Sequence, residues 1–519
     1  HRDLHSFPTR RSSDLVMCMK GRGNKEIQKM LKKGYSYFSY KNISENVVAY
    51  GYEYPIKYHI ETMVLMIIIT FITGLFYQLD TAYIAIIIFT GLVCVPKLIS
   101  VHFSNKYKQR RFNDVDIYIH QMAYSFQRQP KISTALEDTY KIASKDLKEC
   151  IGKALDELQY DNTDKVYERA LGVIENEYDN SRVTTLHKFL INIEKKGGSY
   201  STSLSVLLMD FDNWVKNVYK HQQDIKRVKT NLAIGLILSF FLASVSVIIA
   251  FILKNTSEIQ LDITKNLTYQ ICSTVFIILC LIFYVYTRCA FNDDWVKLGR
   301  DDNKIIKDYK VAFHTKVNTI QRKMFPVCVV MLVVALALLI AKRYVWSIVL
   351  FLFAVYIMYV PKLNIKNARN RINEDVYRGF SDWLRDVAIN LQEEPLMMAI
   401  ENTYNTCPVV IKESLEEFIY EIESNPSDVE PYYNFMSRFG ILDISSMVRT
   451  LYSLSELSIE SADDAINSLI KRNYELMDKH EADKNKDTIS TMKFAEYIPT
   501  VFVSFKIAID MMLVVSNYL

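Results

Sequence analysis

Two oppositely charged side chains, Lys506 and Asp510, stand in an otherwise apolar segment near the end of the chain. Their spacing of four residues places both on one face of a helix, where an ammonium and a carboxylate can form an ion pair. Pairing reduces the several kcal/mol that either charge would cost alone in hydrocarbon. We expect a buried pair that locks helix packing, and the alternative is a contact with an assembling subunit.

Two further carboxylates, Glu137 and Glu401, occupy matching places in two similar segments. Glu137 lies in ALEDTY, which begins at Ala135, and Glu401 lies in AIENTY, which begins at Ala399. Each carboxylate is expected near the start of a helix, where a negative charge interacts favourably with the helix N-terminus. The functional alternative is contact with a partner protein.

The sequence contains no pattern typical of a catalytic, metal or cofactor site. Its eight cysteines form no CxxC pair, and outside residues 1–15 its histidines form no HxxxH or HExxH pair, so we expect neither a zinc site nor a disulfide framework. No GxxxxGK[ST] occurs, and the segment from Gly21 to Lys25 lacks both its spacing and its hydroxyl. Gly197 and Gly198 lie between two predicted helices, where a left-handed turn is favoured over a phosphate loop. We therefore expect no catalytic residue, no cofactor and no metal.

The elements that must position these residues are mostly membrane spans. Seven segments are apolar enough to cross a hydrocarbon core that needs about 20 such residues. They are Tyr58 to Tyr77, Thr81 to Val95, Leu232 to Leu253, Tyr269 to Thr287, Phe325 to Ala341, Tyr344 to Val360 and Tyr497 to Leu519.

Basic residues indicate how these spans are oriented. Lysines and arginines precede the first span and follow the second, which predicts a cytoplasmic N-terminus and a tight external turn from Gln78 to Asp80. The pair Lys342 and Arg343 is discordant, because it falls in an expected external turn. A formal net charge of +4 over 519 residues gives no sign of nucleic-acid binding.

Two soluble segments between the spans show an internal repeat. Lys97 to Lys229 and Lys362 to Phe494 are equal in length. Val-Pro-Lys-Leu occurs at the start of both, beginning at Val95 in the first copy and at Val360 in the second. The ALEDTY and AIENTY segments follow at almost the same separation, with a slip of a single position, so we infer a duplication.

Within each copy, apolar residues recur with the periodicity of an α-helix. One stripe is formed by Val115, Ile119, Met122, Ala123 and Phe126, and the second by Val376, Phe380, Trp383, Leu384, Val387, Ala388 and Leu391. Pro130 and Pro395 then end one helix and open the next. We predict five or six antiparallel helices in each copy.

Together these patterns predict an all-α polytopic membrane protein with about seven transmembrane helices and two duplicated cytoplasmic helical modules. Residues 1–15 contain HSFPTRRSSDL from His5, which resembles a translated sequencing adapter, so we exclude them and expect the native start between Val16 and Met19. The remaining order is a cytoplasmic segment, a hairpin of spans, a first module, two spans, a linker, a second hairpin, a second module and a last span, at 16–57, 58–96, 97–229, 230–288, 289–324, 325–361, 362–494 and 495–519.

This arrangement resembles the type II secretion system F family, in particular the platform proteins of tight-adherence pili. The Ala-Leu-Glu-like step of that family is matched at Ala135 to Glu137 and at Ala399 to Glu401. The glycine that usually precedes it is replaced by Arg128, Gln129 and Pro130 in the first copy and by Glu393, Glu394 and Pro395 in the second. A later family glycine fits Gly197 or Gly198, whereas Ser458 stands at the corresponding place in the second copy.

The resemblance implies a protein of the bacterial cytoplasmic membrane that is not itself an enzyme. It implies that a separate cytosolic ATPase is coupled to the assembly of pilin or pseudopilin subunits. It further implies a homo-oligomer or a complex with other inner-membrane assembly proteins, in a lipid bilayer and without nucleic acid. A membrane transporter or channel with large cytoplasmic domains is the alternative. Such a protein typically has broken spans and an inverted repeat, whereas both halves of this chain have the same predicted orientation.

Overall fold

The computed structural model describes residues 39–518 except positions 161–164, 198–200, 257–262, 293, 297–299, 316, 341–343, 392–393, 426–427 and 456–458. Every regular element within these residues is helical, and none is a strand. The described part of the chain is therefore all-α, as the periodicity predicts. Several predictions fall outside the described residues: the adapter-like residues 1–15, the native start, the basic N-terminal flank, Gly198, Lys342, Arg343 and Ser458.

The chain divides into two compact units. Unit 1 contains residues 1–111, 220–294 and 487–519, and unit 2 contains residues 112–219 and 295–486. Three of their four boundaries lie inside the long helices that contain residues 111, 219 and 486, and the fourth lies between residues 294 and 295, outside any helix. These boundaries therefore differ from those of the predicted domains.

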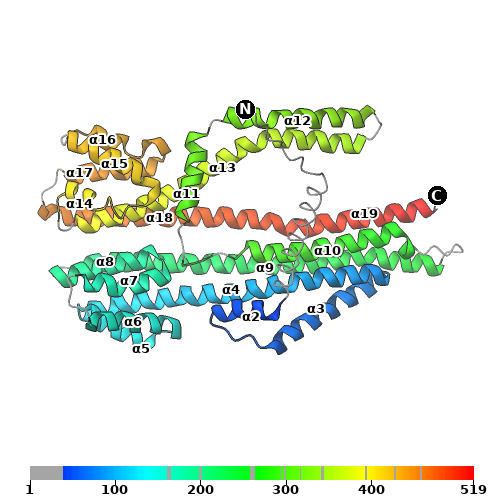
Figure 1. Ribbon diagram of the computed structural model, residues 1–519, viewed down its shortest axis with the longest axis horizontal. Helices are drawn as coiled ribbons and strands as arrows, with labels where there is room; N and C mark the ends of the chain where they lie inside the picture. Colours follow the sequence, from blue (N-terminus) through cyan, green and yellow to red (C-terminus); the bar gives the residue numbers. More distant parts are fainter. Residues whose placement is uncertain are drawn as a thin grey trace, which may run out of the picture. The chain divides into compact units, whose positions relative to one another are not determined.

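Unit 1 is built mainly from long apolar helices (Figure 1). Its elements are α2 (Tyr40–Ala49), α3 (Ile56–Phe76), the first part of α4 (Thr81–Arg128), the second part of α9 (Ser201–Thr256), α10 (Leu267–Ala290), the end of α18 (Ile459–Phe494) and α19 (Ile498–Tyr518), with the short turns η1 (Ile263–Lys265) and η4 (Ala495–Tyr497). The N-cap of α10 is Asn266, whose side chain accepts a hydrogen bond from the backbone N–H of Thr268 at 2.9 Å.

Five helices of the described chain are long and apolar enough to cross a membrane. They are Ile56–Phe76, Thr81–Arg128, Ser203–Ile249, Leu267–Ala290 and Ser468–Ser516. Each of these helices overlaps one of the seven predicted spans. The fifth predicted span corresponds to a shorter apolar stretch, Met324–Ile340 in α12 (Val317–Ile340), and the sixth lies in α13 (Tyr344–Asn390). These two remain predictions as membrane spans.

Helices α3 and α4 form a close hairpin through two glycines. A Cβ atom at Gly74 would lie 2.8 Å from Cγ1 of Ile84, and one at Gly91 would lie 3.1 Å from Cγ2 of Thr70. Gln78, in the predicted tight turn, has a φ of 52°. The hairpin therefore depends on small residues where the two helices approach each other.

The first half of unit 2 is a bundle of six helices. After α4 come α5 (Ile132–Ile142), α6 (Lys145–Tyr160), α7 (Val166–Tyr178), α8 (Ser181–Lys196) and the first part of α9. All five residues of the predicted stripe, Val115, Ile119, Met122, Ala123 and Phe126, are buried in its core. Gly197 ends α8 with a φ of 73° and a ψ of −158°, a positive-φ conformation that favours glycine but differs from the predicted left-handed turn.

The second half of unit 2 repeats this succession of helices. After α13 come α14 (Leu396–Asn402), α15 (Val409–Ser424), α16 (Glu430–Asn434), the turn η3 (Ser437–Phe439), α17 (Leu442–Ser455) and α18 (Ile459–Phe494). The second stripe is buried as predicted, with Leu391 partly exposed. The starts of α14, α15 and α16 follow those of α5, α6 and α7 at one constant separation, the same as that between ALEDTY and AIENTY. Helix α17 begins slightly earlier relative to α8.

The predicted linker contains structure that the sequence did not indicate. Helix α11 (Asp302–Tyr309) and the π-helical turn η2 (Lys310–His314) occupy part of it. Ala312 is buried in the core of the second half, and Tyr309 and Phe313 pack against that core. Asp301 begins α11 by accepting a hydrogen bond from the backbone N–H of Asn303. Residues 302–314 thus belong to the packed bundle.

Candidate functional site

Lys506 and Asp510 form an ion pair on the apolar helix α19 of unit 1. The predicted spacing places both side chains on one face, and that face packs against α10. Only 1% of Lys506 and 3% of Asp510 is exposed. Both charges are therefore buried within this chain, and mutual pairing is what makes their burial tolerable.

Two other helices contribute to the environment of this pair. The hydroxyl of Ser246 on α9 donates a hydrogen bond to Oδ2 of Asp510. The ammonium of Lys506 lies 4.2 Å from the ring centroid of Tyr269 on α10, a cation–π distance. Oδ1 of Asp510 is buried without a hydrogen-bond partner among the described residues. The pair thus joins α9, α10 and α19 through polar contacts in apolar surroundings.

Further hydrogen bonds connect α10 to the turn between α3 and α4. The hydroxyl of Tyr269 donates to the carbonyl oxygen of Tyr77 at 3.2 Å. The side chain of Gln270 accepts from the backbone N–H of Asp80 at 3.0 Å and donates to the carbonyl oxygen of Gln78 at 3.1 Å. These bonds satisfy turn groups that would otherwise be costly to bury. The geometry thus supports the predicted packing lock and leaves little of the pair accessible to another subunit.

Glu137 and Glu401 are both exposed, but their helix positions differ from the prediction. Glu137 is the sixth residue of α5 and Glu401 the sixth of α14, and neither helix has an acidic residue in its first turn. The predicted interaction with a helix N-terminus is therefore wrong. At the start of α5 that role belongs to Glu194 on α8, whose Oε2 accepts from the backbone N–H of Ile132 at 2.7 Å. Sequence reasoning missed Glu194 because it lies on another helix.

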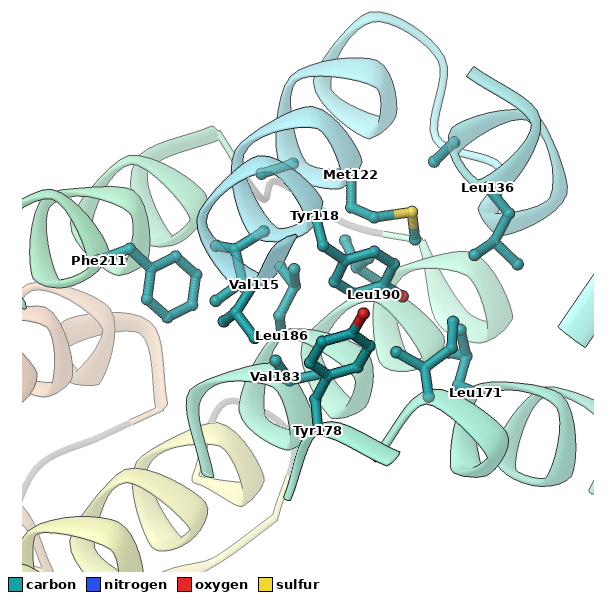
Figure 2. Close-up of a cluster of buried hydrophobic side chains, with 14 of the residues drawn as sticks. Val115, Tyr118, Met122, Leu136, Leu171, Tyr178, Val183, Leu186, Leu190 and Phe211 are labelled. Atoms are coloured by element: carbon teal, nitrogen blue, oxygen red, sulfur yellow. The ribbon is translucent and has the colours of Figure 1, made fainter. Parts of the chain in front are cut away.

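A buried chain of polar groups crosses the core of the first bundle. Nε2 of His187 lies 2.7 Å from the hydroxyl of Tyr118, and Nδ1 lies 2.7 Å from Oε1 of Glu175. Figure 2 shows the ring of Tyr118 among apolar side chains such as Leu186 and Leu190. Burial raises the pKa of Tyr118 well above its usual range. These groups satisfy one another's hydrogen-bonding needs inside the bundle, which indicates a structural role.

Charged residues also collect where the two halves of unit 2 meet. Asp210 on α9 accepts from Nε of Arg182 on α8 at 3.2 Å and lies 4.0 Å from Nη2 of Arg385 on α13. Nη2 of Arg182 lies 3.9 Å from Oε1 of Glu481 on α18. Burial raises the pKa of the Glu481 carboxyl, and the arginine charges partly offset this effect. We call this group, with Lys188 and Asp386 beside it, the junction cluster.

A cavity of about 490 Å³ lies next to the junction cluster. Lys188 and Asp386 face it as an ion pair with an N–O distance of 2.6 Å, and Lys195 is paired with Glu168 at 3.5 Å. Its lysines are thus already neutralised by carboxylates. The cavity therefore offers no unpaired cation that would favour an anionic ligand.

The described residues contain no group of three or more His, Cys, Asp or Glu placed to hold a metal ion. All seven described cysteines carry free thiols. The polar groups of the described chain are engaged mainly with one another. They therefore show no assembled catalytic constellation.

Comparison of the chain with protein-family models, curated proteins and solved structures finds no match.

Proposed function

We propose that this chain is a membrane platform protein that resembles the type II secretion system F family. In this proposal it couples a separate cytosolic ATPase to the assembly of pilin or pseudopilin subunits and has no enzyme activity itself. One observation carries the proposal: the same succession of six helices occurs twice, each time following an apolar helix and beginning with a long helix. Such paired bundles offer surface to soluble partners, and apolar helices offer surface to a pilin helix.

The buried positions support a duplication of the two bundles. Ala135, Leu136 and Thr139 in α5 are buried, and so are their equivalents Ala399, Ile400 and Thr403 in α14. In the entering helices, all five residues of the first stripe match residues of the second at the separation of Val95 from Val360, with Leu391 the most exposed of them. Equivalent positions thus perform equivalent packing roles, as expected if one module had been copied.

The proposal places both modules on the cytoplasmic side of a bacterial inner membrane. Glu137 and Glu401 are exposed matching positions, so each can be replaced singly by cysteine and labelled with a membrane-impermeant maleimide. We expect labelling of both variants in inverted vesicles and of neither in intact cells. Asp80→Cys, in the exposed turn after α3, should show the reverse pattern. Labelling of Glu137→Cys and Glu401→Cys from opposite sides would exclude the parallel duplication.

The coupling function is tested in cells that produce the filament. Deleting the gene should abolish surface filaments while the pilin accumulates in the membrane, and the intact chain supplied in trans should restore them. The buried pair of Lys506 and Asp510 is the feature that a transporter would also possess. Normal filaments together with loss of solute uptake in the deletion strain would favour that alternative and reject the platform.

A further inference from the structure

The contact between the two halves of unit 2 uses different faces of the two bundles. The first half contributes α8 and α9, and the second contributes α13 and α18. Helices α9 and α18 are equivalent in the repeat, whereas α8 corresponds to α17 and α13 to α4. Nη1 of Arg385 donates to Oγ1 of Thr185 at 3.4 Å, and Lys188 pairs with Asp386. A two-fold arrangement of related modules would pair α17 with α4 in the same way, yet Tyr124 on α4 and Leu442 on α17 are exposed. The α8–α13 part of the contact is therefore heterologous.

A heterologous contact leaves one complementary face uncovered on each module. The repeat that aligns Val95 with Val360 also aligns the covered residues of α13 with residues of α4: Arg385 with His120, Asp386 with Gln121 and Ile389 with Tyr124. Alignment of the starts of α8 and α17 matches the covered residues of α8 with residues of α17: Arg182 with Asp443, Thr185 with Ser446 and Lys188 with Arg449. These uncovered positions define two surfaces of the chain.

The first surface, the α4 face, consists of Ile117, Gln121 and Tyr124, which share one side of the helix. Ile389 is only 8% exposed in the internal contact, whereas its equivalent Tyr124 is 54% exposed and Ile117 is 39% exposed. Beside them, His120 lies between Asp116 and Asp212, with N–O distances of 2.9 and 3.0 Å. The α4 face is thus apolar, with a small excess of negative charge at its edge.

The second surface, the α17 face, consists of Leu442, Ser446 and Arg449, again on one side of a helix. Leu442 is 86% exposed, the highest exposure of any large apolar residue described. Arg472 donates to Oγ of Ser446 at 2.8 Å, and Arg449 lies 4.5 Å from the ring centroid of Tyr433. The α17 face therefore combines an unburied apolar side chain with the charges of Arg449 and Arg472, beside the exposed carboxylate of Asp443.

We propose that the α4 face of one chain binds the α17 face of a second copy of the same chain. This inference depends on the duplication within the proposed function. The two faces continue the internal contact outward and carry apolar side chains at their centres and opposite charges at their edges. Such head-to-tail association produces either a closed ring or an open filament of chains, according to the rotation between copies.

Disulfide formation between purified full-length chains in detergent tests this pairing. Chains carrying Tyr124→Cys are mixed with chains carrying Arg449→Cys and oxidised, with the parent chain measuring the background from native cysteines. We expect a covalent dimer from the mixture, at least about tenfold above either variant alone. A chain with both substitutions should form a ladder or a closed ring. The control partner is Tyr420→Cys, which is 72% exposed on α15, outside the α17 face.

Two results would overturn the surface proposal. One is a mixed sample with no more dimer than the parent, and the other is Tyr124→Cys dimerising with itself as strongly as with Arg449→Cys. A second variant, Tyr124→Asp, should weaken self-association about tenfold in light scattering while its helical circular dichroism stays unchanged. These assays need no filament. If cross-linking fails while maleimide labelling follows the expected pattern, only the surface proposal is rejected. If the purified chain cross-links as expected but the deletion strain still forms normal filaments, only the platform function is rejected.

Discussion

At the scale of single residues, the buried charges of this protein are satisfied across helices as well as along them. Asp510 receives a hydrogen bond from Ser246, and Asp210 lies between two arginines. A buried charge without its partner costs far more than the pair contributes, because its desolvation is then uncompensated. Substitutions that remove one member of such a group should therefore be more harmful than those that remove both.

The pair on α19 gives a direct test of this asymmetry. Asp510→Leu leaves the Lys506 ammonium without its carboxylate and should lower the free energy of unfolding by about 3–5 kcal/mol. The double variant Lys506→Met with Asp510→Leu should recover a large part of that loss. Unfolding in mixed micelles by titration with dodecyl sulfate measures both, with Ser504→Ala on the exposed side of α19 as the control. Equal losses of unfolding free energy in the single and double variants would contradict the role of this pair in locking helix packing.

His120 should make stability depend on pH. Its contacts with Asp116 raise its pKa from 6.5 to about 9 despite partial burial, and Asp212 adds to the effect. Because the folded pKa is the higher one, this contribution is complete below pH 6.5 and disappears as the pH rises through 9. The melting temperature of the parent should exceed that of His120→Gln at about pH 6, and the difference should vanish near about pH 10. A constant difference across this range would exclude the imidazolium as its cause.

The charge pair itself was predictable because both members lie four residues apart on one helix. Ser246 and Tyr269 were not, since each lies on another helix, far earlier in the chain. For the same reason, the sequence predicted that Glu137 interacts with the N-terminus of α5, whereas Glu194 on α8 makes that interaction. Sequence spacing shows which residues share a helix face, but not which residues of other helices that face contacts.

At the scale of elements, how closely two helix backbones can approach depends on side-chain size. Helices α3 and α4 approach each other at Gly74 and Gly91, where an added Cβ would meet Ile84 and Thr70. Apolar helices in lipid gain little from the hydrophobic effect against one another, so close packing becomes the main source of their association. The α3–α4 hairpin should therefore be sensitive to added methyl groups.

Gly74→Val should disrupt this hairpin. Its new side chain would meet Ile84, itself branched at Cβ and buried, so the helices must separate or adopt strained rotamers. We expect a loss of about 1–3 kcal/mol in the free energy of unfolding. Gly172→Ala in α7 is the matched control, because nothing lies within 4 Å of its new Cβ. That variant should gain about 0.5–1 kcal/mol from higher helix propensity, and a loss in both variants would argue against local packing.

Helix periodicity predicted most elements, including the break at Pro130 and the buried stripes of α4 and α13. It did not predict α11 and η2, because residues 289–324 carry many charges and their few apolar side chains show no long stripe. Ala312 is nevertheless buried in the core of the second half, and the ring of Phe313 packs against that of Phe439. Short amphipathic segments become helices when tertiary packing completes them.

At the scale of the whole molecule, one carboxylate connects the two bundles of unit 2. Asp210→Asn would leave Arg182 and Arg385, which are 4% exposed each, with less negative charge around them. We expect a loss of about 2–4 kcal/mol in the free energy of unfolding, because removing one member of a buried ion pair leaves the other charge buried and unpaired. The control is Asp156→Asn on the exposed side of α6. If both substitutions had the same small effect, the junction cluster would not hold the bundles together.

The repeat was predictable from residues that recur at a nearly constant spacing, and the helix starts follow that spacing. The junction cluster was not predictable, because Arg182, Asp210 and Arg385 resemble ordinary solvated charges in their local sequence. Their roles come from faces that differ between the copies: Arg385 corresponds to His120, and Arg182 to Asp443. In the proposed duplication, the core pattern is kept while the two surfaces differ.

The polar contacts of α19 also bear on biosynthesis. Helix α19 contains the charged pair and is the last helix of the described chain to be translated. Its charged pair contacts Ser246 on α9 and Tyr269 on α10. We therefore expect α19 to be stable in lipid only when α9 and α10 are also inserted. A chain in which those two helices are missing would expose a charged pair in an apolar segment, which is costly in hydrocarbon.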